Sequence, residues 1–252
     1  MAGYYSAMID QAFNLANLTP RQKQLRLEIL RLSYQKKYSH LGSCLTAVDG
    51  IDAVYQVKKP QDIFVLSNGH AAVAWYIVLK NLGLVTEAQL NSLYIHPDRN
   101  PATGIEVSTG SLGQGLPIAV GLALADPMRK IYCMISDGES TEGSIWESFR
   151  FLADFQVNNL VVLLNANGWG AYDRVATDKL IQRMKGFGLN IVECHGHRPA
   201  EISQTLQAIQ PASPTAVVLH TTNNQLPFLK DQDAHYYVMN ETDWLTAQEL
   251  LT

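Results

Sequence analysis

Short apolar runs that end in polar residues recur along this chain, and longer stretches of mixed polarity separate them. Runs of four to seven residues that are rich in Val, Ile and Leu, with no polar alternation, are typical of strands buried on both faces of a parallel sheet. The pattern therefore predicts buried parallel strands at 131–135 and 160–164, and further strands at 63–66, 189–194 and 215–220.

The segments between these runs have the spacing and start signals of helices. Thr19-Pro20 opens a helix that extends to about Tyr34. Further helices are predicted at 47–55, 71–82, 116–125 and 199–209. Because strand and helix alternate along the chain, we expect an α/β fold with a mostly parallel sheet.

Composition and charge limit the classes of function. The chain has 252 residues, of which 47% are hydrophobic and 17% charged, so it is long enough for one large α/β core, and we expect a single domain. The net charge is −4 and there is no Lys/Arg-rich run. The chain therefore lacks the positive charge with which proteins bind nucleic acids or anionic membrane surfaces, and we expect its partners to be small molecules or proteins.

Cysteine usage and the absence of long apolar segments indicate a cytoplasmic protein. Cys44, Cys133 and Cys194 lie far apart and form no CxxC pair, so neither disulfides nor a structural zinc site is expected. The N-terminus lacks the features of a secretory leader, and no apolar run reaches the roughly 18 residues of a membrane span.

The most informative polar residues are Asp137 and Asn167, which follow two successive predicted strands. About 30 residues, the length of one βαβ crossover, separate them, so both should lie at the carboxyl edge of the sheet, where such sheets bind ligands. A carboxylate, an amide oxygen and a backbone carbonyl from the turn 168–170 suit Mg²⁺, and Gly138 lets backbone N–H groups approach a diphosphate. The alternative is that both are ordinary turn residues at strand ends.

Two further features have functional and ordinary interpretations. The glycine-rich segment 108–115 matches neither GxxxxGK[ST] nor GxGxxG, which disfavours a nucleotide site, and it could be only a tight turn before a close-packed helix. Histidines can exchange protons near neutral pH, as acid–base chemistry requires. We interpret His195, His197 and His220 as ordinary core or surface residues.

Several motifs together resemble the diphosphate-binding domain of transketolase, a thiamine diphosphate-dependent family. In order and spacing they are Ser67-Asn68-Gly69-His70, the segment 109–115, Asp137-Gly138-Glu139 through Glu142-Gly143, and Asn167. The resemblance implies a three-layer α/β/α domain over 1–252, with 1–18 as an N-terminal extension. The pyrimidine-binding and C-terminal domains of a usual transketolase have no counterpart here, so the chain looks like the smaller subunit of a split transketolase.

The resemblance also implies site residues. The metal, Mg²⁺ or Ca²⁺ or Mn²⁺ in its place, would be held by Asp137, Asn167 and the main-chain carbonyl of Trp169. Histidines that face the substrate would be His40, His96 and, as the loosest match, His235. Residues that contact thiamine diphosphate would be His40, His70, Gly110, Ser111, Leu112, Asp137, Gly138, Glu139, Glu142 and Asn167.

The activity implied is transfer of a two-carbon ketol unit from a ketose donor to an aldose acceptor. A second subunit would carry the missing domains in an α₂β₂ assembly, and this chain alone would be inactive. The chain departs from the family pattern at Ser136, at Ile95 before His96, at 220–225, and at Tyr236-Tyr237 after His235, where glycine is common. Two alternatives stay open: the α subunit of a 2-oxo acid dehydrogenase, and a non-catalytic scaffold or regulatory homologue.

Overall fold

The core of the fold is a five-stranded sheet. The computed structural model describes residues 13–210 and 212–252, so the first 12 residues of the expected N-terminal extension lie outside it. The strand order is β1-β2-β3-β5-β4, and all four neighbouring pairs are parallel. The strands are β1 (Ile63–Leu66), β2 (Ile131–Ser136), β3 (Leu160–Ala166), β4 (Asn190–His195) and β5 (Thr215–His220). All five predicted strands are confirmed.

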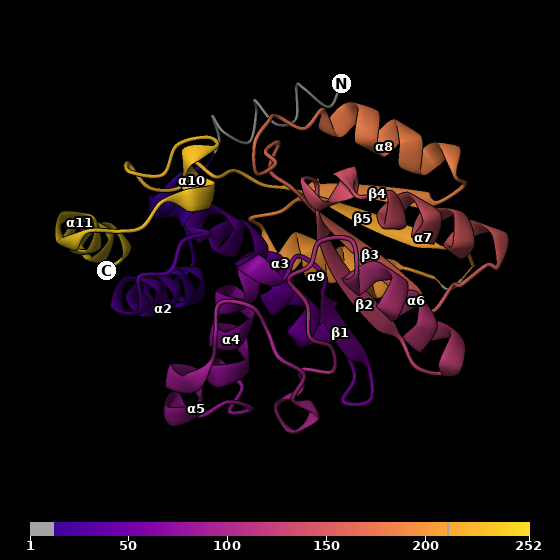
Figure 1. The fold of residues 1–252 in the computed structure, drawn as a ribbon, viewed down its shortest axis with the longest axis horizontal. Coiled ribbons are helices and arrows are strands. Elements are labelled where there is room, and N and C mark those ends of the chain that lie inside the picture. Colours follow the sequence, from indigo (N-terminus) through magenta and orange to yellow (C-terminus); the bar gives the residue numbers. More distant parts are fainter. Residues whose placement is uncertain (1–12, 211) are drawn as a thin grey trace.

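Helices cover both faces of this sheet, which confirms the predicted three-layer α/β/α arrangement (Figure 1). The core on one side of the sheet contains side chains of α2 (Pro20–Lys36), α3 (Leu41–Val57), α4 (Ala72–Asn81), α9 (Pro199–Ala208) and α11 (Glu241–Leu251); α3 and α9 lie against strands, and α11 packs on α2. The core on the other side contains side chains of α6 (Gly115–Ala125), α7 (Gly143–Asp154) and α8 (Thr177–Gly186). Successive strand residues point to opposite faces, so Phe64 and Met134 join the first core and Val65 and Cys133 the second.

The start of α2 was predicted from a cap in the sequence, and the start of α3 was missed. Thr19 and Gln22 form a capping box at the start of α2. The predicted start of α3 at Ala47 was wrong, because α3 begins at Leu41. The N-cap of α3, His40, has a left-handed backbone and makes no side-chain capping hydrogen bond. Because α3 is buried from Leu41 to Val54, its first turns also lack the alternation of apolar and polar positions that marks a surface helix.

The remaining elements are short, and two longer helices had no sequence prediction. The short ones are α5 (Glu87–Ser92), α10 (Asp233–Tyr236) and the 3-10 turns η1 (Leu15–Asn17), η2 (Gly69–Ala71), η3 (Pro101–Thr103) and η4 (Glu139–Thr141). The unpredicted helices are α8 and α11. Within residues 13–210 and 212–252, no helix has both the length and the apolar character needed to cross a bilayer.

Candidate functional site

Asp137, directly after β2, faces the turn that follows β3. Its Oδ2 accepts a hydrogen bond from the backbone N–H of Gly168 at 2.6 Å, and its Oδ1 accepts one from Gly138 at 2.9 Å. Asp137 is fully buried, which raises the pKa of its carboxyl to about 7, although those backbone N–H groups act in the opposite direction. The structure thus brings the Asp137 carboxylate against the turn that contains Asn167.

The turn after β3 supplies oxygen atoms beside this carboxylate. The Asn167 Oδ1 accepts a hydrogen bond from the Trp169 N–H at 2.9 Å. A Cβ on Gly138 would lie 2.9 Å from the Cα of Gly170, so the two turns approach closely only because Gly138 has no side chain. In the described part of the chain, no group of three His, Cys, Asp or Glu side chains could hold a metal ion. The expected ligand set contains only one such residue, because the others are an amide and a main-chain carbonyl.

A cavity of about 220 Å³ opens above these turns at the carboxyl edge of the sheet. The expected site residues that line it are His70, Leu112, Gly138, Glu139, Glu142, Asn167, Trp169 and His235. Four others lie next to this lining: Asp137 binds Gly138, His40 contacts His70 and His235, and Gly110 and Ser111 belong to the turn that holds Leu112. The last, His96, lies over Gly110. The topology therefore gathers residues from six separate segments around one cavity.

Buried polar atoms without partners suit a polar ligand in this cavity. Asn68 is fully buried, and neither its Nδ2 nor its Oδ1 has a hydrogen-bond partner among the described residues. The Glu139 Oε1 accepts hydrogen bonds from the Ser67 hydroxyl at 2.6 Å and the Gly113 N–H at 2.8 Å, but its Oε2 has no partner there. Buried polar groups almost always have partners, so these atoms indicate a polar ligand. The Asn68 Nδ2 can donate to a diphosphate oxygen, and the Asp137 carboxylate can bind the metal ion.

Three histidines form a cluster on one side of the cavity. The ring centroids of His40 and His235 are 4.6 Å apart, those of His40 and His70 5.1 Å, and those of His70 and His235 5.3 Å. His235 reaches α3 because Gly42 leaves room for Ala234 of α10, whose Cβ would be 2.9 Å from a Cβ at position 42. His96 is exposed and lies over Gly110, where an added Cβ would be 2.7 Å from its ring.

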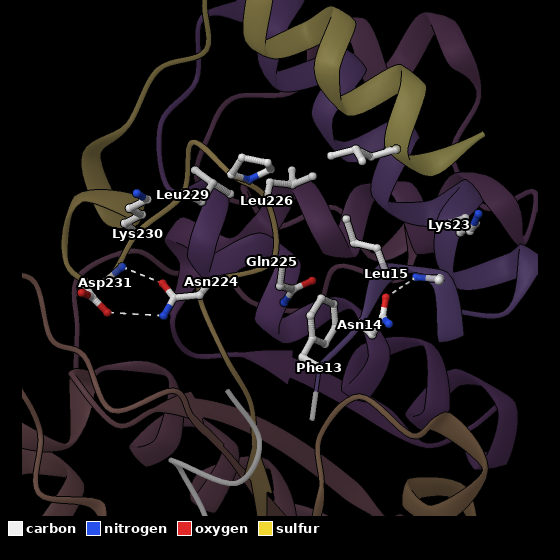
Figure 2. A pocket seen from close by; sticks show the side chains of 13 residues that line it. Phe13, Asn14, Leu15, Lys23, Asn224, Gln225, Leu226, Leu229, Lys230 and Asp231 are labelled. Carbon is white, nitrogen blue, oxygen red and sulfur yellow. Dashed lines mark hydrogen bonds between the residues drawn. The ribbon is translucent and has the colours of Figure 1, made fainter. Parts of the chain in front are cut away.

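A larger cavity, of about 850 Å³, lies elsewhere and contains none of the expected site residues. It is lined by residues 13–16, Lys23, Leu250 and parts of the segment 224–231. Figure 2 shows Asn224 and Asp231 hydrogen-bonded at one end of it and Lys23 at the other, with leucines between them. We assign the candidate site to the smaller cavity, because the buried unpartnered polar atoms and the histidine cluster lie there.

Comparison with known proteins decides the family. Residues 53–236 match the family model described as transketolase, thiamine diphosphate binding domain. This chain belongs to the transketolase family. It is 31% identical over 239 residues to one subunit of the apulose-4-phosphate transketolase of Actinobacillus succinogenes, a match that covers 83% of this chain and 87% of the relative. The predicted likeness to the N-terminal subunit of a split transketolase is confirmed.

Full-length transketolases match over a smaller part of their own length. The chain is 31% identical to the transketolase of Pongo abelii over 247 residues, which cover 88% of this chain but 39% of that protein. The transketolase structure from Campylobacter jejuni aligns with a TM-score of 0.76 at 23% identity, over 92% of this chain and 42% of that chain, which shows the shared fold. These matches favour a transketolase over the α subunit of a 2-oxo acid dehydrogenase.

Sequence reasoning missed two kinds of residue in this transketolase site. Asn68 lies in the Ser67–His70 motif, but the sequence analysis assigned it no function. Its position just after the buried strand β1 is a signal that could have identified it. Tyr172 and Arg174 also line the cavity, and the Arg174 guanidinium lies 4.4 Å from the centre of the Trp169 ring. Nothing in the local sequence pattern marks these two, because the 167–175 segment has no regular period.

The histidine cluster of this transketolase domain should make its stability depend on pH. Burial lowers the pKa of His70 to about 3, with further lowering by His40, and burial lowers the pKa of His40 to about 4. The pKa of an unfolded histidine is near 6.5, so the unfolded state gains protons on these imidazoles below that pH while the folded state keeps them neutral. The free energy of unfolding is therefore highest above pH 6.5 and falls as the pH decreases toward 3.

The change that tests this is His70→Gln, compared with the wild type by urea unfolding. Between about pH 7.5 and 5.5 the wild type should lose about 1.4 kcal/mol more unfolding free energy than the variant, which lacks the titrating group. Asp137 and Glu139, whose raised pKa values near 7 have the opposite effect, are present in both proteins and cancel in the difference. Equal pH dependence in the two proteins would contradict the assigned burial of His70.

Proposed function

We propose that this chain binds thiamine diphosphate and Mg²⁺ as one subunit of a two-component transketolase, which transfers a two-carbon ketol unit from a ketose to an aldose. The observation that carries this proposal is the fully buried Asp137 carboxylate beside the Asn167 turn, in a cavity that also holds the unpartnered Asn68 amide. The family match supports the cofactor, and the site residues support the metal.

Each residue at the carboxyl edge has a role in holding the cofactor. Asp137, the Asn167 amide oxygen and the Trp169 carbonyl would hold Mg²⁺, which prefers octahedral coordination by about six oxygen ligands. Gly138 and His70 would contact the diphosphate itself. Leu112 lines the same cavity and, with Gly110 and Ser111, would lie against the cofactor ring. Glu142 is exposed at the cavity and would face the partner subunit.

The histidines act on the sugar. When bound, thiamine diphosphate supplies a nucleophilic carbon and an electron sink for the two-carbon unit. His40 and His235 are neutral near pH 7, because burial lowers the pKa of both, so each imidazole can donate one hydrogen bond and accept another. They would orient the hydroxyl and carbonyl oxygens of the ketose and exchange protons with them. His96, which is exposed, would bind the donor at the outer side of the site.

The partner is part of the proposal. The chain spans about 40% of the full-length transketolases it matches, and the relative from Actinobacillus succinogenes is itself named as one subunit of a transketolase. We propose that residues 1–252 form a diphosphate-binding domain and that a second chain supplies the pyrimidine-binding and C-terminal domains in an α₂β₂ enzyme. The donor and acceptor sugars would be chosen partly by that second chain.

The test is reconstitution with a chain from the same genome that carries those two domains. With thiamine diphosphate and Mg²⁺, the mixture should transfer a ketol unit between sugars, and the chain alone should show no turnover. Turnover by the chain alone would contradict the two-component proposal. A stable complex that binds the cofactor but transfers nothing from a panel of ketoses would favour the non-catalytic homologue instead.

A further inference from the structure

The helix α6 is apolar on every side, although one side of it faces outward. Its 11 residues, GLPIAVGLALA, include no charged or polar side chain. Leu116, Ala119 and Ala123 are buried in the core that α6 forms with the sheet. On the outer side, however, Ile118 is 40% exposed and Leu124 is 46% exposed. A helix that is apolar all round is normally buried all round, and the described part of the chain leaves this side of α6 uncovered.

The neighbouring helix α7 has the outer surface that contact with water favours. Arg150 forms ion pairs with Glu147 and Asp154 along its exposed side. α6 lies beside α7 and is part of the same layer (Figure 1), but its outer side has no such residue. At 11 residues, α6 is also too short to cross a bilayer, which takes about 20. Its outer side therefore has the composition of a protein interface.

A glycine in the middle of this outer side is not explained by packing within the chain. Gly121 is exposed, and a Cβ added to it would have none of the described atoms within 4 Å. Glycine inside a helix destabilises the helix relative to alanine. A protein that covers α6 gives a reason for this glycine, because a position without a Cβ lets another main chain approach closely.

The outer side of α6 adjoins the candidate site. α6 begins at Gly115, just after the turn that holds Leu112, and Leu112 lines the cavity. α7 begins at Gly143, directly after Glu142, which is exposed and lines the same cavity. A protein that covers the mouth of the cavity can therefore continue over α6.

We propose that the α6 face, formed by Pro117, Ile118, Gly121, Leu124 and Ala125, binds the second subunit of the enzyme. The proposal rests on the proposed function. The Actinobacillus succinogenes relative is named as one subunit of a transketolase, and this chain spans 39% of the transketolase of Pongo abelii. The larger part of such an enzyme thus lies outside this domain and is available to cover it. Because the α6 face carries no charge, we expect an apolar surface of the second subunit on it, with main chain close to Gly121.

Leu124→Lys tests the α6 face by calorimetric titration with the candidate second subunit used for reconstitution. Leu124 is exposed in the isolated chain, so the lysine stays in water there and urea unfolding should match the wild type. In the complex the charge would be buried against an apolar surface, and the affinity should fall about 10- to 100-fold. The matched control is Leu245→Lys on α11, on the other side of the sheet, where Leu245 is 57% exposed; its affinity should equal that of the wild type.

Gly121→Leu separates binding from folding. The added side chain has open space in the isolated chain and favours the helix, so the free energy of unfolding should not decrease. The same side chain would occupy the space that the main chain of the second subunit needs, so the affinity should fall about 10-fold or more. Wild-type affinity in both Gly121→Leu and Leu124→Lys would overturn the assignment of the α6 face.

The remaining outcomes distinguish this inference from the proposed function. If the wild-type mixture transfers ketol units and both variants bind the second subunit as tightly as the wild type, the α6 assignment alone is wrong. If the isolated chain is a dimer that Leu124→Lys separates, without weaker binding of the second subunit, the α6 face joins two copies of this chain and the inference is overturned. If the wild-type chain binds no second subunit, the two-component proposal fails, and this inference fails with it.

Discussion

Replacing Asp137 by Ala should lower the affinity of the chain for thiamine diphosphate with Mg²⁺ by at least about 100-fold, or about 2.7 kcal/mol. The reason is that Asp137 supplies the only carboxylate of the proposed ligand set, and it is fully buried against the Asn167 turn. Without it, the Gly168 and Gly138 N–H groups also lose their acceptor. Calorimetric titration of the cofactor, with the partner chain present, measures the effect.

Two controls separate loss of the metal ligand from loss of the fold. Asp137→Asn keeps the size of the side chain and one oxygen acceptor but removes the charge, and it should also bind the cofactor weakly. Asp126→Asn makes the same chemical change after α6, at the amino edge of the sheet, where Asp126 is 44% exposed, and its affinity should equal that of the wild type. Equal affinities for all three variants would refute the metal assignment.

Replacing Asp49 by Ala should lower the free energy of unfolding by about 3–5 kcal/mol. Asp49 and Arg26 are buried, and their closest atoms are 2.5 Å apart. The Arg26 charge holds the pKa of Asp49 well below its usual range despite burial, and a hydrogen bond from His197 contributes. Removal of Asp49 leaves the buried guanidinium without its counter-ion.

The matched control is Asp52→Ala, one turn further along α3. Asp52 also pairs with an arginine of α2, but that partner, Arg21, is 41% exposed, so the expected loss is about 1 kcal/mol or less. Urea unfolding of both variants gives the comparison. If Asp49→Ala is no less stable than Asp52→Ala, the buried ion pair does not hold α2 and α3 together as described.

His197, which the sequence analysis interpreted as an ordinary residue without a catalytic role, belongs to the same buried network. Its Nδ1 lies 3.0 Å from the Asp49 Oδ2, and its side chain is 2% exposed, so it joins the turn after β4 to α3. This agrees with its interpretation as an ordinary core residue. From sequence alone its partner could not be found, because no periodic pattern connects a histidine in that turn with an aspartate on α3.

The proximity of Asp137 to Asn167 was predictable, because two adjacent parallel strands place their carboxyl ends together, and the strands themselves are marked by uninterrupted apolar runs. The proximity of His235 to His40 depends on α10 resting on Gly42, and only the resemblance to transketolase indicated it. The hydrogen bond from the Gln232 Nε2 to the Ala171 carbonyl joins two irregular segments, for which sequence periodicity carries no information.

The most direct test of the proposed site is anomalous diffraction from crystals of the two-chain complex grown with thiamine diphosphate and Mn²⁺. We predict one strong manganese peak about 2.1 Å from an Asp137 carboxylate oxygen, the Asn167 Oδ1 and the Trp169 carbonyl oxygen, with two diphosphate oxygens in its coordination shell. A manganese peak elsewhere, with the Asp137 and Asn167 side chains directed away from the diphosphate, would contradict the assignment of this site.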